Sequence, residues 1–337
     1  MVDLGQILLI VTIIMALVYA YSNGLNDAAN AIATVVATRA LTPRAAVILG
    51  GSMNLVGALT GTAVAKTIGK GIVDPDFMTQ SAVLAAVLAA VIWVITATRF
   101  GLPVSVSHSL VAGVLGAGIS TAGFSRVNEA AMTKVLMALA LSPILGFLGA
   151  FLLMILLYWI LRHRTLSRVN KIFVKLQILS AALLSYSHGK NDAQNAVGIM
   201  ALGWAVYYSS NDVHVDVTIE PWMQLTAGIA IGVGIAVGGW RVIRTVGTKI
   251  TRLEPTSGFI SNMSAAVVIE TASQIGLPVS TTHTASSAII GVGATRGVSA
   301  ISLTVIRSIF GAWLVTYPFC FGVAWILAKV LESIIPS

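Results

Sequence analysis

Charged residues are scarce in this chain of 337 residues, where they make up only 9% of the sequence. A soluble domain carries roughly 25% charged residues. Hydrophobic residues account for 57%, and the mean hydropathy is +0.92. A single soluble core cannot bury so much apolar surface, so the composition excludes an ordinary soluble enzyme and indicates lipid as the solvent.

Cysteine and acidic residues are also few. Cys320 is the only cysteine, which excludes an intrachain disulfide and a cysteine-based metal cluster. The chain has 20 basic and 12 acidic residues. The basic residues fall in gaps between apolar runs, as in the cytoplasmic loops of membrane proteins, so we expect no nucleic-acid partner. The sequence contains no stretch typical of an organic-cofactor site.

Long apolar stretches are abundant, and they predict an all-α polytopic membrane protein with roughly 10–12 membrane segments. The gap at 162–175 has five basic and no acidic residues, which favours a cytoplasmic loop. It separates a first membrane repeat, 1–161, from a second, 176–337. The gap at 207–220 is acidic and is expected outside. One crossing each way places the N-terminus outside, in an integral, multi-pass protein of the plasma (inner) membrane.

The chain contains an internal duplication. Residues 21–31 match residues 186–196 at eight of eleven positions, and residues 101–108 match residues 276–283. The two offsets are 165 and 175 residues. Paired halves whose apolar segments are interrupted by glycine or proline are typical of secondary transporters with inverted repeats. We therefore expect two inverted repeats with broken helices and re-entrant hairpins.

The first duplicated block carries an Asn-Asp pair inside an apolar stretch. Charged residues at such depth normally face the bundle interior and have a partner. Gly24 and Gly189 would allow each helix to break before its Asn-Asp pair, so that carboxylate and amide oxygens converge on Na⁺. The alternative is a buried Asp that only holds helices together. The candidate Na⁺ ligands are Asn23, Asn26, Asp27, Asn191 and Asp192, with Ser105 and Ser280 from the second block.

The second duplicated block follows Pro103 and Pro278 with a run of hydroxyl residues at the start of a new apolar segment. A helix N-terminus offers N–H groups and partial positive charge, which suits an oxyanion. Simple N-capping and helix packing are the alternative for the hydroxyls, and loop orientation is the alternative for the histidines. The candidate anion-binding residues are Ser105, Val106, Ser107, His108, Ser280, Thr281, Thr282 and His283.

Other polar residues in the apolar stretches have less definite roles. Lys190 and Glu270 stand where the first half has Leu25 and Ile95. Glu270 could gate, relay a proton or pair with Lys190. The residues considered for gating or relay are His188, Lys190, Asn195 and Glu270.

The duplicated Asn-Asp blocks, the two Pro-Val-Ser blocks and residues 245–259 resemble the inorganic phosphate transporter (PiT) family. The resemblance covers nearly the whole chain, although the long central hydrophilic loop of animal members is missing. It implies a symporter of inorganic phosphate with an inverted repeat, in a homodimer. It also implies that Asp27 and Asp192 matter for transport and that the Ser/Thr blocks hold phosphate.

We expect Na⁺ as the coupling ion, since the Asn-Asp motif offers neutral oxygens around a single carboxylate. H⁺-coupled phosphate transport and sulfate transport remain alternatives within the family. Two equivalent copies of a site argue against an intramembrane enzyme, and interrupted segments fit alternating access better than a channel. The expectation is therefore a carrier with a midplane site at the repeat interface and no enzymatic activity.

Overall fold

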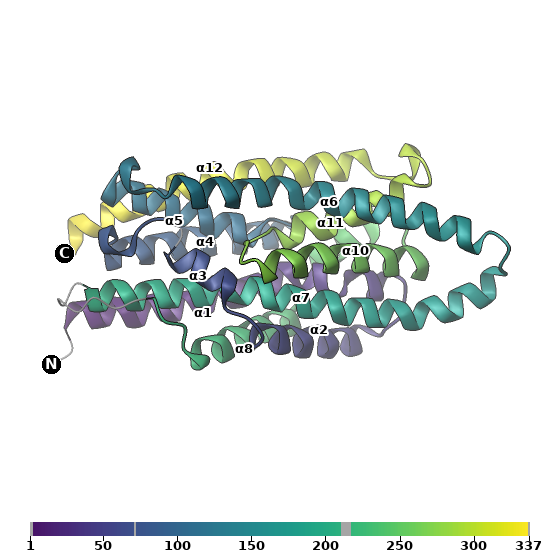
Figure 1. Cartoon of the computed structure of the whole chain (residues 1–337), viewed down its shortest axis with the longest axis horizontal. Helices are drawn as coiled ribbons and strands as arrows, with labels where there is room; N and C mark the ends of the chain where they lie inside the picture. Colours follow the sequence, from purple (N-terminus) through teal and green to yellow (C-terminus); the bar gives the residue numbers. More distant parts are fainter. Residues whose placement is uncertain (1–2, 71, 210–216, 336–337) are drawn as a thin grey trace.

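The computed structural model describes residues 3–70, 72–209 and 217–335 (Figure 1). Within these residues the chain forms twelve α-helices and no β-strand, which confirms the all-α prediction. A π-helical segment, Thr245–Lys249, continues the ninth helix. The helices are α1 (Leu4–Ala37), α2 (Pro43–Ala58), α3 (Ala63–Lys70), α4 (Gln80–Phe100), α5 (Val106–Ala122), α6 (Glu129–Leu161), α7 (Leu166–Ser209), α8 (Pro221–Val237), α9 (Trp240–Arg244), α10 (Pro255–Gln274), α11 (Thr281–Ala294) and α12 (Leu303–Ile334).

Local sequence signals set many of the helix starts. Thr42, Thr79 and Asn128 are N-cap residues whose side chains accept a backbone N–H from the first turn of α2, α4 and α6. Pro43 and Pro221 occupy the first turns of α2 and α8, where no intrahelical donor is lost. The apolar runs between these signals become helices because a helix satisfies its own backbone groups in lipid.

Several of the helices are suited to crossing a membrane. Within the described residues, α1, α4, α6 and α12 are each long and apolar enough to span it. The α2–α3 pair and the α8–α9 pair, the latter extended to Lys249, also pass this test when each is taken together. These pairs bend by 70° and 66°, respectively. Interrupted spans therefore exist, as the fold class requires, but these two interruptions lie at residues 59–62 and 238–239, where the sequence did not predict a break.

Two re-entrant hairpins enter from opposite ends of the molecule. Helices α4 and α5 pack together as one hairpin, and α10 and α11 as the other. Gly101 and Gly276 turn the chain at the two tips with φ of 71° and 72°, a conformation that favours glycine. In Figure 1 the α4–α5 hairpin lies toward the left and the α10–α11 hairpin toward the right. Their tips therefore meet near the centre.

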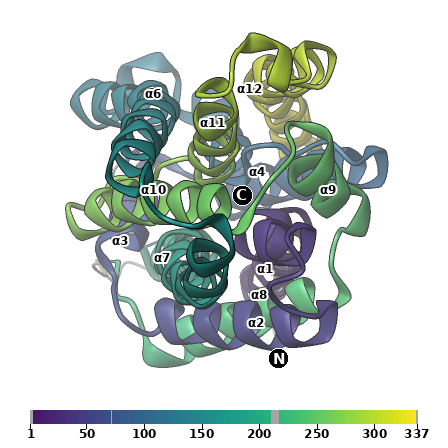
Figure 2. The ribbon, with the colours of Figure 1, turned by 90° about the vertical axis from the view of Figure 1, so that its right-hand side faces the viewer.

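Equivalent helices of the two halves run in opposite directions. In Figure 1, α1 starts at the left, whereas α7 starts at the right after the turn at 162–165. Helices α1 and α7 pack against each other. Seen from the end in Figure 2, they lie side by side between α2 and α8 on one side and α6, α11 and α12 on the other. This arrangement has the geometry of an inverted repeat.

The two halves interlock and do not form separate bodies. Helix α1 packs against α8 and α2 against α7, while α5 packs against α12 and α6 against α11. Each of these pairs joins one helix from 1–161 to one from 166–337. The core is therefore shared, and neither half can bury its apolar surface alone.

The predicted break before each Asn-Asp pair is wrong. Helices α1 and α7 run without interruption through Gly24 and Gly189. A Cβ at Gly24 would lie 2.2 Å from the Ile231 carbonyl oxygen, and one at Gly189 would lie 2.1 Å from that of Asn54. These glycines are required for close helix packing, so their presence did not signal a change of backbone direction.

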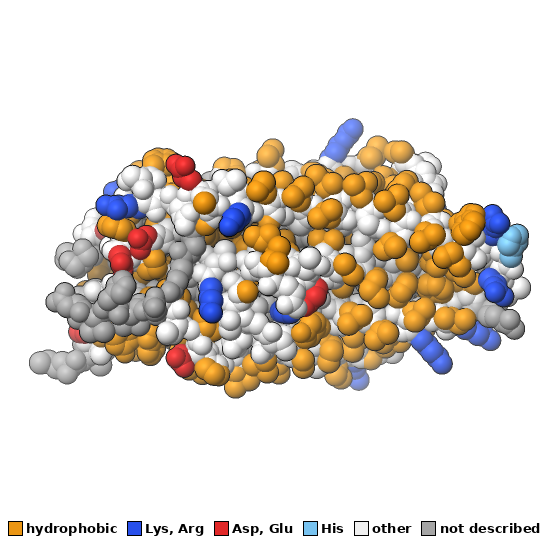
Figure 3. All heavy atoms as spheres, viewed as in Figure 1, with side chains coloured by type: hydrophobic (Ala, Val, Ile, Leu, Met, Phe, Trp, Pro, Cys, Tyr) orange, Lys and Arg blue, Asp and Glu red, His pale blue; other side chains and the backbone are white. Residues whose placement is uncertain are grey.

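The charged ends of the molecule differ in sign. Lys and Arg gather at the right-hand end in Figure 3, near the α6–α7 turn, and acidic groups lie mainly at the left, where both termini lie in Figure 1. Of the expected 162–175 loop, only 162–165 lies outside the helices, and the remainder begins α7. In the expected acidic loop, Asp212 and Asp216 lie outside the described residues.

Candidate functional site: a buried carboxylate cluster between two hairpin tips

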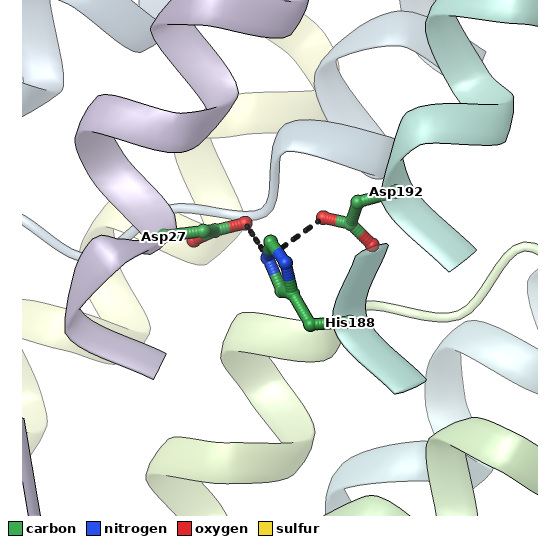
Figure 4. A group of neighbouring side chains, drawn as sticks. All are labelled: Asp27, His188 and Asp192. Carbon is green, nitrogen blue, oxygen red and sulfur yellow. Dashed lines mark ion pairs between the residues drawn. The ribbon is translucent and has the colours of Figure 1, made fainter. Parts of the chain in front are cut away.

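Two aspartates meet at the centre of the molecule. Asp27 on α1 and Asp192 on α7 are each 1% exposed. His188, one turn before Asp192, lies between them (Figure 4). Its Nε2 atom is 3.5 Å from Asp27 Oδ2 and 3.4 Å from Asp192 Oδ2. Because the first half has Asn23 at the position of His188, the duplication alone did not predict an imidazole bridging both carboxylates.

Asn54 on α2 fixes the orientation of this imidazole. Its Oδ1 lies 2.6 Å from His188 Nδ1, and its Nδ2 donates to the Gly50 carbonyl at 2.8 Å. An amide oxygen only accepts, so Nδ1 carries the hydrogen and Nε2 is left to face the carboxylates. A proton or another cation is needed to bring a ring nitrogen and two carboxylates together. Asp27, His188 and Asp192 accordingly form a group that could hold a metal ion.

The tip of the α10–α11 hairpin contacts both aspartates. Thr282 Oγ1 donates to Asp27 Oδ1 at 2.6 Å. Thr281 Oγ1 lies 3.1 Å from Asp192 Oδ2 and 3.4 Å from Asp27 Oδ2. Both threonines are in the first turn of α11, so the partially positive N-terminus of this helix faces the carboxylate cluster.

The two hairpin tips are held by equivalent contacts from the opposite halves. Asn30 Nδ2 on α1 donates to Thr282 Oγ1 at 3.1 Å, and Asn195 Nδ2 on α7 donates to Ser107 Oγ at 2.8 Å. Asn30 and Asn195 are related by the first offset of the duplication, and Ser107 and Thr282 by the second. Each helix of the first motif therefore binds the hairpin of the other half.

Several buried amide oxygens around this cluster have no hydrogen-bond partner. Asn23 Nδ2 donates to Asp192 Oδ2 at 3.2 Å, but Asn23 Oδ1 is unpaired. The Oδ1 atoms of Asn30 and Asn195 are also buried and unpaired. A buried acceptor without a donor costs free energy, and a hard cation is satisfied by such oxygens. The donor set therefore fits a small cation.

Ser105 and Ser280 cap the helices at the two tips. Their Oγ atoms accept the backbone N–H groups of His108 and His283, each at 3.1 Å. The capping explanation therefore applies to these two hydroxyls. It does not explain Ser107, Thr281 and Thr282, whose hydroxyls face α1 and α7.

Asn26 does not converge with the aspartates, whereas one end of the Asn191 amide lies 3.3 Å from Asp192 Oδ1. Asn26 Nδ2 donates to Thr98 Oγ1 at 2.9 Å and to the Leu102 carbonyl at 3.1 Å, and its Oδ1 accepts Val104 N–H. The Asn191 amide lies 2.9 Å from Ser273 Oγ and 3.3 Å from the Leu277 carbonyl. Adjacent residues of an unbroken helix point about 100° apart. The prediction that Asn26 joins Asp27 at one ion therefore required the break that does not exist.

The two motif histidines join the hairpin tips to each other. The rings of His108 and His283 are 4.5 Å apart at an interplanar angle of 89°. His283 also stacks on Trp313 of α12 at 3.7 Å, and Trp313 Nε1 donates to the Pro103 carbonyl at 3.1 Å. These contacts show a role in orienting the tips.

Lys190 and Glu270 form an ion pair outside the cluster, with Nζ and Oε1 2.5 Å apart. Gln274 Nε2 donates to the same carboxylate oxygen at 2.7 Å. Lys190 therefore does not neutralise Asp192, although it is only two residues away.

Tyr19 and Asn54 were missed as contributors to the site. Tyr19 is fully buried, and its hydroxyl donates to the Val106 carbonyl at 3.0 Å. It lies eight residues before Asp27, with Asn23 halfway, so the helical period places all three on one face. That spacing was a usable signal for Tyr19. Asn54 was a lone amide in an apolar stretch, and its partner His188 is 134 residues away.

The arrangement describes a closed central site. Hydroxyls and two helix N-termini face a pair of carboxylates, and Asp27, Asp192, Ser107, Thr281 and Thr282 are all at most 2% exposed. Two hairpins from opposite ends meet there, in a chain whose helices are suited to a membrane. These features define a membrane transporter with interrupted spans and a buried central site.

Comparisons with known proteins identify the kind of transporter. A model of the phosphate transporter family matches residues 23–168 and 161–324. A probable low-affinity inorganic phosphate transporter of Bacillus subtilis (strain 168) is 42% identical, covering 98% of this chain and 99% of that protein. A protein of the same description from Rhizobium meliloti (strain 1021) is 40% identical, covering 92% of each chain. The chain belongs to the phosphate transporter family, as its motifs indicated.

A solved structure has the same fold. It is described as the sodium-dependent phosphate transporter, and it superposes with a TM-score of 0.89 at 30% identity. The match covers 97% of this chain and all of that one.

Proposed function

We propose that this protein is a symporter that couples inorganic phosphate uptake to Na⁺ by alternating access at the midplane site. The observation that carries the proposal is the meeting of two opposed hairpin tips at the Asp27–Asp192 pair. The tips supply hydroxyls and helix N-termini for an oxyanion, and the aspartates supply charge for a cation.

Na⁺ is supported by the chemistry of the oxygens. Asp27 and Asp192 offer carboxylates, and Asn23 Oδ1 is buried beside them without a donor. The solved relative is described as sodium-dependent. We assign Asp27, Asp192 and Asn23 to the ion, with Ser105 and Ser280 close by at the hairpin caps. Asn26 and Asn191 position the hairpins instead.

Phosphate would bind at the first turns of α5 and α11. Ser107, Thr281 and Thr282 present hydroxyls there, and the segments 105–108 and 280–283 offer N–H groups. Within the described residues, no Lys or Arg forms an ion pair with Asp27 or Asp192, because Lys190 pairs with Glu270. A phosphate beside two carboxylates therefore needs bound cations to balance its charge, which is a physical basis for coupling.

Phosphate is favoured over sulfate at this site for a related reason. Monohydrogen phosphate can donate a hydrogen bond to Asp27 or Asp192, whereas sulfate has no hydrogen to donate. Because the relatives are transporters, we propose transport without chemical conversion and no requirement for an organic cofactor.

The orientation and assembly are part of the proposal. The basic end of the molecule, at the α6–α7 turn, would face the cytoplasm of a cell with this protein in its plasma (inner) membrane. The N-terminus would then lie outside. We also propose a homodimer, which cross-linking in intact membranes would detect.

H⁺ coupling is the second candidate, and His188 is the observation that favours it. An imidazole between two carboxylates can itself carry the balancing positive charge. His188→Asn would give α7 the residue that α1 has at Asn23. If the protein couples to Na⁺, this variant should retain Na⁺-driven uptake, whereas an H⁺-coupled protein should lose its uptake.

The deciding experiment is uptake of ³²P-phosphate into proteoliposomes with Na⁺ and H⁺ gradients imposed separately. We expect a Na⁺ gradient to drive uptake at equal pH on both sides, and excess sulfate to compete weakly. Uptake driven by the H⁺ gradient alone would show that H⁺, and not Na⁺, is the coupling ion. Strong inhibition by sulfate would overturn the selectivity argument.

A further inference from the structure

A small cavity lies outside the central site, between the tip of the α4–α5 hairpin and the basic end of the molecule, toward which α1 runs in Figure 1. Its volume is about 260 Å³, and it lies between the end of α4 and the α9 region. Gly101, Arg241, Arg244 and Lys249 line it. Residues 245–259 are the family-like segment for which the central site provides no role, and Lys249 belongs to that segment.

Among the described residues, basic side chains and no acidic ones line the cavity. Arg241 is held by donating to the Arg99 carbonyl at 2.7 Å. Arg244 and Lys249 are exposed, and their side chains make no ion pair or hydrogen bond within the described residues. A concave surface lined by positively charged side chains concentrates anions.

A second basic cavity at the same end differs in this respect. It has a volume of about 450 Å³ and contains Arg162 and Arg164, but Glu254 also lines it. The two cavities therefore have similar basic groups, and only one has a carboxylate that can neutralise them. The second cavity is therefore a matched control: removing its basic residues lowers the positive charge of this end of the molecule by the same amount without changing the first cavity.

The position of the first cavity connects it to the transport site. Gly101 is at the tip of the α4–α5 hairpin, and a Cβ there would lie 3.1 Å from Arg241 Cβ. Four residues later, Ser105 caps α5 at the central site. The cavity therefore lies behind the tip whose other side holds Ser107. At the opposite tip, Thr67 Oγ1 on α3 donates to the Gly276 carbonyl at 2.7 Å.

We propose that this cavity is a second, weaker site for a phosphate group, in which Arg244 and Lys249 receive phosphate after it leaves the central site at the basic end. The inference rests on the proposed phosphate transport, but not on the identity of the coupling ion. Free inorganic phosphate is the proposed occupant. A lipid headgroup presents the same chemistry and is the alternative source.

The test compares two double variants with the same loss of charge. Arg244→Gln/Lys249→Gln removes the proposed site, and Arg162→Gln/Arg164→Gln removes two charges from the control cavity. Phosphate transport is measured in right-side-out and inverted vesicles of phosphatidylcholine. We expect the first variant to raise KM about fivefold or more on the basic face and to leave KM on the opposite face unchanged. The control variant should change neither value.

A charge-retaining variant, Arg244→Lys/Lys249→Arg, should have the wild-type KM. That result would show that the raised KM of the glutamine variant comes from the lost charge and not from misfolding. Equal changes on both faces, no change on either, or the same change in the control variant would overturn the proposal. If vesicles with the wild-type protein show no phosphate transport, the proposed function itself is refuted, which is a separate result.

The lipid source is tested in nanodiscs. Phosphatidylglycerol in the nanodiscs could raise the melting temperature of wild type but not of Arg244→Gln/Lys249→Gln. If, in addition, the vesicle assay gives the same KM for wild type and variant, the cavity holds a lipid headgroup and the free-phosphate proposal fails. A face-specific KM effect in phosphatidylcholine alone supports free phosphate.

Discussion

The two halves of the molecule share a framework but differ in their chemistry. Asn30 binds Thr282 in the same way that Asn195 binds Ser107. Asn26 contacts the Leu102 carbonyl as Asn191 contacts that of Leu277. The first pair of contacts joins each hairpin to the opposite half, and the second pair joins each hairpin to a helix of its own half. The duplicated residues that are identical, or nearly so, are thus those that hold the scaffold.

The positions where the halves differ lie closer to the charges. His188 stands at the position of Asn23, Thr281 at that of Val106, and Lys190 at that of Leu25. His188 and Thr281 contact both aspartates, whereas Lys190 is paired outside the cluster. A point between two symmetry-related carboxylates has room for one side chain only, so the centre of a duplicated site cannot itself be duplicated. The duplicated residues therefore build the scaffold and supply both carboxylates, whereas the asymmetric His188 and Thr281 link the two carboxylates to each other.

The strongest test of this comparison removes one carboxylate at a time. Asp27→Asn and Asp192→Asn should each reduce ion-driven phosphate uptake by about a hundredfold or more, because losing a charged ligand costs about 3 kcal/mol. Uptake into proteoliposomes measures the loss. Glu129→Gln, at an exposed position on α6, is the control and should behave as wild type. Near-normal uptake in either aspartate variant would remove that half from the ion site.

A smaller effect is expected from the glycines that allow α1 and α7 to pack closely. Gly24→Ala and Gly189→Ala place a Cβ within 2.2 Å of a carbonyl oxygen and should destabilise the protein by about 1–3 kcal/mol each. Gly311→Ala on α12 meets nothing within 4 Å and should be neutral or stabilising by about 0.5–1 kcal/mol. Melting temperatures in detergent should separate the two groups. Equal stability of all three variants would refute the packing role.

The smallest effect should come from giving the second half the residues of the first. Lys190→Leu alone leaves Glu270 half-buried without its partner and should cost about 1–3 kcal/mol. The double variant Lys190→Leu/Glu270→Ile should recover to within about 1 kcal/mol of wild type, since an apolar pair can replace an ion pair. Both are measured by thermal unfolding. A double variant that is stable but cannot transport would instead give the pair a functional role.

The sequence predicted the elements whose signals are local. Apolar length identified the helical membrane fold, and Pro103 and Pro278 marked the two re-entrant turns. The matching blocks indicated the duplication, and the opposite directions of α1 and α7 in Figure 1 have the geometry expected from it. Asp27 and Asp192 stood out because acids are rare at such depth.

The features that the sequence did not predict depend on partners distant in the chain. A glycine in the sequence is compatible both with a helix break and with close packing of a neighbouring helix. Only the short distance between Gly24 and Ile231 in the structure shows that Gly24 serves packing. The prediction that Asn26 is an ion ligand depended on a helix break at Gly24. Because α1 is continuous, that prediction was wrong as well. The bridging position of His188 needs α1, α2 and α7 together, which no single motif contains.

The interlocking of the halves also has a consequence for biosynthesis. When the first 161 residues have left the ribosome, Asn30 and Asp27 have been made, but their partners Thr282 and His188 have not. These polar groups of the first half therefore gain their partners only after α7 and α11 have been made. A chain that stops between the repeats leaves the Asp27 carboxylate without these partners, and an unpaired acid at membrane depth costs free energy.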